Sequence, residues 1–149
     1  MQATDLIRPE HVIPHLAVPS KAALLQALSG EAAGRFGLDA EAVCAALCRR
    51  EALGSTGVGD RVAIPHAPVA GLKRPFGLLA RLDRPVAFEA IDGEPVDIVC
   101  LLLTSGGGGR ASLDALACIA RRLRVQDVRD RIRRAGDRRE IHAALHEAG

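Results

Sequence analysis

The residue best suited to chemistry is His66, which follows a short apolar run and a proline. An imidazole titrates near neutrality, so much of it is unprotonated at pH 7 and can attack an electrophile such as phosphorus. Sixteen positions upstream, Arg50 supplies a guanidinium, the side chain best shaped for binding phosphate. This pair predicts a catalytic site in which His66 is the nucleophile. The alternative is a purely structural histidine at a strand end.

The segment between these two residues is rich in glycine and hydroxyl groups. Glycines let the backbone turn its N–H groups toward an anion, and hydroxyls add further donors. The segment lacks the Lys-Ser/Thr ending of a P-loop and the GxGxxG spacing of a dinucleotide site, so we do not expect a nucleotide there. The phosphate-binding residues that it predicts are Gly54, Ser55, Thr56, Gly57 and Gly59.

The same residues carry a family resemblance. The matching blocks are residues 50–51, 54–59 and 63–66, followed by 85–88, 90–93 and 95–97. From about Val12 to about Leu145, the sequence resembles enzyme IIA of the bacterial phosphoenolpyruvate:sugar phosphotransferase system, in the fructose/mannitol class. The most similar branch is the nitrogen-related regulatory enzyme IIA. The resemblance implies an α/β fold.

The resemblance also implies a role for each matching residue. His66 would accept a phosphoryl group from a phosphohistidine carrier protein, HPr or its nitrogen-related homologue, and neither a cofactor nor a metal would be needed. Further partners would be a transporter, a sensor kinase or a sugar permease domain. A second hypothesis is a regulatory interaction module whose partner binding depends on its phosphorylation state.

Two positions depart from the family pattern. Many members carry a second histidine where this chain has Ser112, which can hydrogen-bond a phosphoryl oxygen but cannot be a cation at pH 7. We therefore count Ser112 among the phosphate-binding residues. Small residues or Asn-Gly are more usual at Asp60 and Arg61; Arg61 would be either an extra phosphate contact or a solvated charge.

These residues must be positioned by a chain of 149 residues, the length of one domain with a substantial core. Short strands and amphipathic helices alternate, so we predict a single-domain α/β sandwich, residues 1–149, with a mixed sheet of about five strands and helices on both faces. Residues 96–104 should form a buried central strand. Residues 1–10 should be loosely held, residues 67–75 a loop and residues 83–85 a turn. Helical patterns cover residues 20–35, 39–51, 112–124, 126–135 and 137–147.

Composition limits the partners and the compartment. A net charge of +2 gives no reason to expect a nucleic-acid partner, and no apolar run approaches the ~20 residues of a membrane span. Four cysteines in apolar or helical contexts read as buried and reduced, and no secretory signal is visible, so we expect a cytoplasmic protein. His142 and His146 have helical i,i+4 spacing, but no third metal ligand is evident. The arginines of residues 121–139 are expected on salt-bridged outer helix faces.

Overall fold

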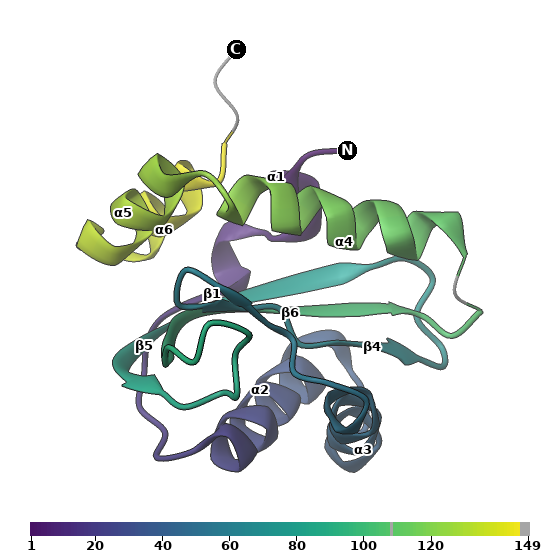
Figure 1. Cartoon of the computed structure of the whole chain (residues 1–149). Coiled ribbons are helices and arrows are strands. Elements are labelled where there is room, and N and C mark those ends of the chain that lie inside the picture. Colours follow the sequence, from purple (N-terminus) through teal and green to yellow (C-terminus); the bar gives the residue numbers. More distant parts are fainter. Residues whose placement is uncertain (108, 147–149) are drawn as a thin grey trace.

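The computed structural model describes residues 1–107 and 109–146. In this part of the chain, a mixed six-stranded sheet lies between two layers of helices (Figure 1). Helices α2 (Lys21–Phe36) and α3 (Ala40–Ala52) cover one face. The short α1 (Ala3–Leu6) and helices α4 (Arg110–Leu123), α5 (Gln126–Arg134) and α6 (Arg138–Ala144) cover the other. The predicted α/β architecture is confirmed.

The sheet is built around its last strand, β6 (Val96–Ser105), which is buried along almost its whole length, as predicted. The strand order is β1-β5-β6-β3-β2, and β4 pairs with β6. Strand β1 runs parallel to β5, and β3 and β4 run parallel to β6, whereas the β5–β6 and β2–β3 pairs are antiparallel. The other bounds are β1 (Val12–Leu16), β2 (Gly57–Gly59), β3 (Val62–Ala63), β4 (His66–Val69) and β5 (Phe76–Val86).

Helix ends follow local chemistry. Ser20 accepts a hydrogen bond from the backbone N–H of Ala23 at the start of α2, and Asp39 accepts one from Glu41 at the start of α3. Gly37 ends α2 in the left-handed conformation, with a φ of 68°. These boundaries confirm the sequence prediction. The last predicted helix ends at residue 147, which lies outside the described residues.

The prediction that residues 1–10 are loosely held is wrong. Ala3, Leu6 and Ile7 are buried beneath α4, and a 3-10 turn, η1 (Pro9–His11), leads into β1. Ile7 lies against Gly77 of β5, where a Cβ would come within 2.6 Å of its Cγ1 atom. Three apolar residues in a polar segment are a weak local signal, and the contacts that order them come from α4 and β5, far along the chain.

The predicted loop at residues 67–75 and the turn at residues 83–85 are also corrected. The first loop begins with strand β4, whose Pro68 is tolerated because β4 has β6 as its only partner among the described strands. The turn is part of β5, where the register with β6 shifts between Arg81 and Val86. Such a bulge leaves residues unpaired, so turn-forming residues can remain inside a strand.

Six of the nine arginines in residues 121–139 are exposed, as expected for outer helix faces, but two others satisfy helix ends. Arg129 is 8% exposed and donates to the carbonyl oxygens of Leu123 and Arg124 at the end of α4. Arg122 donates to the carbonyls of Ala144 and Leu145 at the end of α6. These bonds satisfy carbonyls that a helix leaves unpaired, and they place positive charge at the negative end of the helix dipole.

Two further expectations concern cysteines and membranes. Cys100 and Cys118 are buried, as expected, but Cys44 is only half-buried and Cys48 is exposed. Burial raises the pKa of the Cys100 thiol to about 12, so it is unreactive. None of the helices in the described ranges is both long and apolar enough to span a bilayer.

Candidate functional site

Strands β3 and β4, on either side of Pro65, form one extended segment that runs beside β6. Strands β3 and β4 both pair with β6, and the offset between paired residues is the same on the two sides of Pro65. The carbonyl of Pro65 accepts a hydrogen bond from Leu102 at 2.9 Å, and proline has no N–H of its own to pair. His66 therefore begins β4 beside the middle of β6, at a break between two short strands. The sequence predicted that His66 lies at a strand end followed by a loop, whereas in the structure it is the first residue of a second strand.

The imidazole of His66 is oriented by one hydrogen bond. Its Nδ1 atom lies 2.8 Å from the carbonyl oxygen of Ile64. A carbonyl oxygen can only accept, so in the neutral ring Nδ1 carries the proton and Nε2 keeps a lone pair. The ring is half-buried. Nε2 is thus the nitrogen available for nucleophilic attack.

The His66 side chain points to the side of the sheet that α4 covers. Ile64 and Leu102 both belong to the core beneath α4, and His66 is two residues from the first and directly paired with the second. Alternation along a strand and pairing across strands put all three side chains on one face. This places the imidazole on the same side of the sheet as α4.

Ser112 lies in the first turn of α4 and on its inner side. It precedes Ala115 and Ile119, both buried, by three and seven residues, the helical spacing for a common face. Its Oγ atom is buried and has no hydrogen-bond partner in residues 1–107 and 109–146. A buried hydroxyl without a partner is uncommon and calls for an explanation, such as a bound anion or water.

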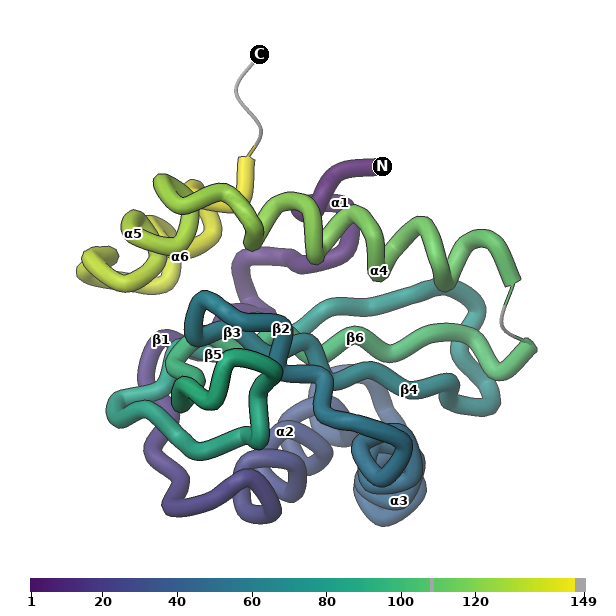
Figure 2. The backbone as a smooth tube through the Cα atoms, in the orientation of Figure 1, coloured from purple at the N-terminus to yellow at the C-terminus, as the bar shows by residue number. Residues whose placement is uncertain are grey.

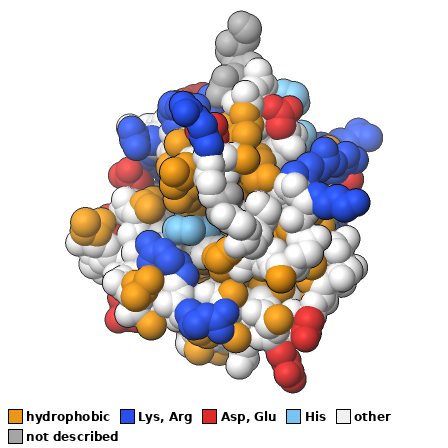
Figure 3. Space-filling model, turned by 90° about the vertical axis from the view of Figure 1, so that its right-hand side faces the viewer, with side chains coloured by type: hydrophobic (Ala, Val, Ile, Leu, Met, Phe, Trp, Pro, Cys, Tyr) orange, Lys and Arg blue, Asp and Glu red, His pale blue; other side chains and the backbone are white. Residues whose placement is uncertain are grey.

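The start of α4 adds to this environment. The helix has 14 residues, its N-cap is Gly109, and no side chain caps its first N–H groups. Unpaired N–H groups at a helix N-terminus favour an anion. The face seen in Figure 3 includes this end of α4 and the end of β4, and a histidine reaches its surface among basic and hydrophobic side chains.

The predicted phosphate loop leads from α3 through β2 and β3 toward β4 (Figure 2). Its hydroxyls already have partners within the protein. Ser55 Oγ donates to the carbonyl of Phe88 at 2.6 Å and accepts from the N–H of Gly57 at 3.0 Å. Thr56, 4% exposed, donates its hydroxyl to the Glu51 carboxylate. In this structure Ser55 and Thr56 hold the loop in place, and their contact with a phosphate remains a prediction.

The loop requires glycine for a different structural reason at different positions. A Cβ on Gly57 would stand 2.7 Å from the Cβ of Ala90, so only glycine allows β2 to approach the loop after β5 so closely. Gly54 and Gly59 have positive φ angles of 152° and 95°, which favour glycine. Their N–H groups remain predicted phosphate ligands.

Arg50 lies at the end of α3, which packs against β4. Its Nη1 atom donates to the carbonyl of Gly54 at 2.9 Å, and the side chain is half-buried. The guanidinium thus bonds to the start of the loop, not to His66. A catalytic role for Arg50 requires one of its other nitrogens and remains a prediction.

Sequence reasoning missed Glu51. Its side chain is 6% exposed, and its carboxylate accepts from the Lys21 ammonium at 3.0 Å and from the Thr56 N–H at 3.1 Å. Lys21 also lies over the Phe88 ring, 4.5 Å from its centroid. The pair connects α2, α3 and the loop. A glutamate next to Arg50 in the matching block was the available signal.

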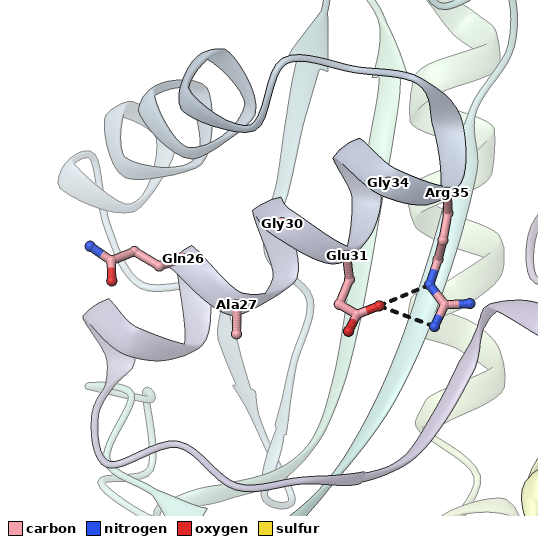
Figure 4. A pocket seen from close by; sticks show the side chains of 6 residues that line it. All are labelled: Gln26, Ala27, Gly30, Glu31, Gly34 and Arg35. Atoms are coloured by element: carbon pink, nitrogen blue, oxygen red, sulfur yellow. Dashed lines mark hydrogen bonds and ion pairs between the residues drawn. The ribbon is translucent and has the colours of Figure 1, made fainter.

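Other features of the described chain do not compete with this site. A cavity of about 530 Å³ lies along the outer side of α2, and Figure 4 shows small residues and the Glu31–Arg35 ion pair there. It offers no nucleophile. His142 Nε2 donates to the carbonyl oxygen of Ile7, 2.9 Å away, and no cluster of three metal-ligating side chains occurs in the described ranges.

Comparisons with known proteins identify the family of the chain. Residues 5–148 match the family model "Phosphoenolpyruvate-dependent sugar phosphotransferase system, EIIA 2". A "Nitrogen regulatory protein" of Bradyrhizobium diazoefficiens is 48% identical over 97% of this chain and 95% of its own length. One from Klebsiella oxytoca is 33% identical over 100% of this chain and 93% of its own length.

Among solved structures, nitrogen regulatory protein IIA-Ntr from Neisseria meningitidis superposes with a TM-score of 0.88 at 30% identity, covering 95% of this chain and 97% of its own. Enzyme IIAMTL, in its complex with phosphorylated enzyme IIBMTL from Escherichia coli, shares the fold, with a TM-score of 0.77 at 15% identity over 94% of this chain and 98% of its own. The chain therefore belongs to the EIIA 2 family of the phosphoenolpyruvate-dependent sugar phosphotransferase system.

Proposed function

We propose that this protein is a cytoplasmic phosphotransfer protein in which His66 Nε2 accepts a phosphoryl group from a phosphohistidine carrier protein. The observation that supports this most strongly is the hydrogen bond from His66 Nδ1 to the carbonyl of Ile64. It fixes the tautomer in which Nε2 is the nucleophile. It also gives the Nδ1 proton a partner when the ring becomes positively charged.

The proposed step is an in-line displacement at phosphorus. The Nε2 lone pair forms the new N–P bond while the N–P bond of the carrier breaks, and its electron pair returns to the imidazole of the carrier. The phosphoryl group adds about −1.5 to −2 charges and three acceptor oxygens, so nearby donors must stabilise it. No proton has to leave His66, because Nδ1–H is retained throughout.

The donors that we propose for the phosphoryl oxygens are the Ser112 hydroxyl and the N–H groups at the start of α4. The supporting observations are the lack of a partner for Ser112 Oγ in the described chain and the absence of a side-chain cap on this helix. Gly54, Gly57, Gly59, Ser55 and Thr56 complete the predicted surroundings. Arg50 would stabilise the developing charge through a nitrogen not used by Gly54.

A regulatory output is the second candidate, and the printed names of the relatives favour it: "Nitrogen regulatory protein" recurs among them. In this reading the phosphorylated and unphosphorylated forms bind different targets, such as a transporter or a sensor kinase. Phosphate-dependent capture of such a target without phosphoryl transfer would favour it. Loss of label to a sugar permease domain would favour onward transfer.

The test is phosphorylation with phosphoenolpyruvate and the general phosphotransferase proteins, followed by intact-mass measurement. We expect one acid-labile phosphoryl group on the wild type and on the control His15→Ala, since His15 is exposed and pairs with Asp83. His66→Ala should accept none, Arg50→Ala should accept slowly, and Ser112→Ala should still accept. Full labelling of His66→Ala would refute the assignment.

A further inference from the structure

A cavity beside the start of β6, away from His66, is lined by three arginines. It has a volume of about 470 Å³, within the range of small-molecule sites. We call it the arginine basin; it is lined by His15, Arg61, Arg81, Leu82, Asp83, Asp97, Arg133 and Ala135. Asp97 precedes Leu102, the partner of His66, by five residues, so the two sites are separated by ~17 Å along the strand.

Each guanidinium of the basin is held by the fold. Arg133 of α5 binds both oxygens of Asp97, which is 8% exposed, at 3.0 to 3.2 Å. Arg61 reaches the same carboxylate at 2.7 Å. Arg81 of β5 donates to the carbonyls of Pro14, Ile132 and Ala135. Side chains fixed in this way lose little entropy when a ligand binds.

Arg61 reaches the basin from an unfavourable backbone conformation. It is the second residue of the tight β2–β3 turn, and both it and Asp60 have positive φ angles, 64° and 56°. This is the type I′ geometry, which favours Asn-Gly. A left-handed arginine costs roughly 1–2 kcal/mol. Strained positions cluster at functional sites. Of the two sequence expectations for Arg61, the solvated charge is met in part, because the side chain is 44% exposed and pairs with Asp97, while a phosphate contact stays a prediction.

The basin has more positive than negative charge, and some of its guanidinium N–H groups are available to a ligand. Three guanidiniums face two carboxylates, Asp83 and Asp97, which leaves one positive charge uncompensated when His15 is neutral. In the described part of the chain, Arg61 Nη1, Arg81 Nη2 and Arg133 Nη1 have no hydrogen-bond partner. Convergent guanidinium N–H groups match the oxygens of a phosphate group.

We propose that the arginine basin is a second anion site, separate from His66, that binds the phosphate group of a small molecule. The lining contains no Phe, Tyr or Trp ring to stack on a nucleobase, and the His15 imidazole is paired with Asp83, so the ligand that we assign is an inorganic phosphate, a pyrophosphate or a phosphate ester of a non-aromatic metabolite. The three guanidiniums supply the charge and the donors. Asp97 holds two of them in place.

The test is titration of the protein with inorganic phosphate, pyrophosphate and a sugar phosphate at low ionic strength, followed by NMR of arginine Nε–Hε signals. We expect saturable shifts at Arg61, Arg81 and Arg133, with pyrophosphate binding most tightly. Arg61→Gly should weaken binding by about tenfold, because glycine suits the turn while the guanidinium is lost. The matched control is Arg131→Ala, an exposed arginine of α5 that does not line the basin. It should change the dissociation constant by less than about twofold.

His66→Ala should bind these ligands as tightly as the wild type does. The test of the basin is therefore independent of whether His66 is the phosphorylated residue. Equal weakening by Arg61→Gly and Arg131→Ala would show only general charge attraction and would overturn the proposal. Absence of saturable shifts at the three arginines with all three ligands would overturn it as well. Preference among the ligands would tell a free phosphate from a phosphate ester.

Discussion

Replacing Glu51 with alanine should destabilise the protein strongly, because this carboxylate joins three parts of the fold. Its removal leaves the Lys21 ammonium, 17% exposed, without its nearest counter-ion, and leaves the Thr56 N–H and hydroxyl without their acceptor. Breaking a buried ion pair from one side costs about 3–5 kcal/mol. Lys21 keeps Glu89 at 3.6 Å as a second partner. We therefore expect a loss near the lower end, about 3 kcal/mol.

The assay is urea unfolding followed by far-UV circular dichroism, since the chain has no Trp or Tyr for fluorescence. A loss of about 3 kcal/mol corresponds to a fall in Tm of roughly 6–12 °C for a domain of this size. The matched control is Glu31→Ala, which removes the exposed Glu31–Arg35 pair on α2. That change should cost less than about 1 kcal/mol.

A double-mutant cycle with Lys21→Ala separates the ion pair from the loop contacts. Part of the Glu51→Ala cost should persist when Lys21 is already absent, because Thr56 still loses its acceptor. If Glu51→Ala costs no more than Glu31→Ala, the reasoning that this pair anchors the loop is refuted. If the stability falls but His66 is phosphorylated at the normal rate, the loop is anchored without any catalytic consequence.

Two glycine substitutions and one serine substitution test the packing around the site. Gly57→Ala should cost about 1–3 kcal/mol in urea unfolding, because its Cβ would clash with Ala90. Gly34→Ala should stabilise by up to about 1 kcal/mol, since nothing lies within 4 Å of its Cβ on α2; equal effects at Gly34 and Gly57 would contradict the geometry. Ser112→Ala should leave the unfolding free energy unchanged or raise it slightly, because its buried hydroxyl has no partner in the described chain. The same change should shorten the half-life of the phosphohistidine, and an unchanged half-life would remove Ser112 from the phosphate site.

The features that sequence predicted correctly are those encoded by neighbouring residues. Ser20, Gly37 and Asp39 mark helix ends because caps act within a few positions. The apolar run of β6 indicates a strand buried on both faces without reference to any partner. The role of His66 stays a prediction, and it too rests on neighbouring residues, because the glycine–hydroxyl segment and Arg50 lie just before it.

The features that sequence missed depend on residues far apart in the chain. The N-terminal segment is ordered because Leu6 and Ile7 pack into the core beneath α4 and Ile7 lies against Gly77 of β5. Strand β4 forms because it pairs with β6, although Pro68 by itself argues against a strand. The role of Glu51 depends on Lys21, thirty residues before it, and the place of Arg61 depends on Asp97. No local pattern contains these pairings.

The central claim is that His66 Nε2 accepts the phosphoryl group while Nδ1 keeps its proton. The direct measurement is long-range ¹H–¹⁵N NMR of the phosphorylated protein with ¹⁵N-labelled histidine, which reports the nitrogen bonded to phosphorus. The account predicts phosphorus on Nε2 of His66 and a protonated Nδ1. Phosphorus on Nδ1, or on any other residue, would contradict it.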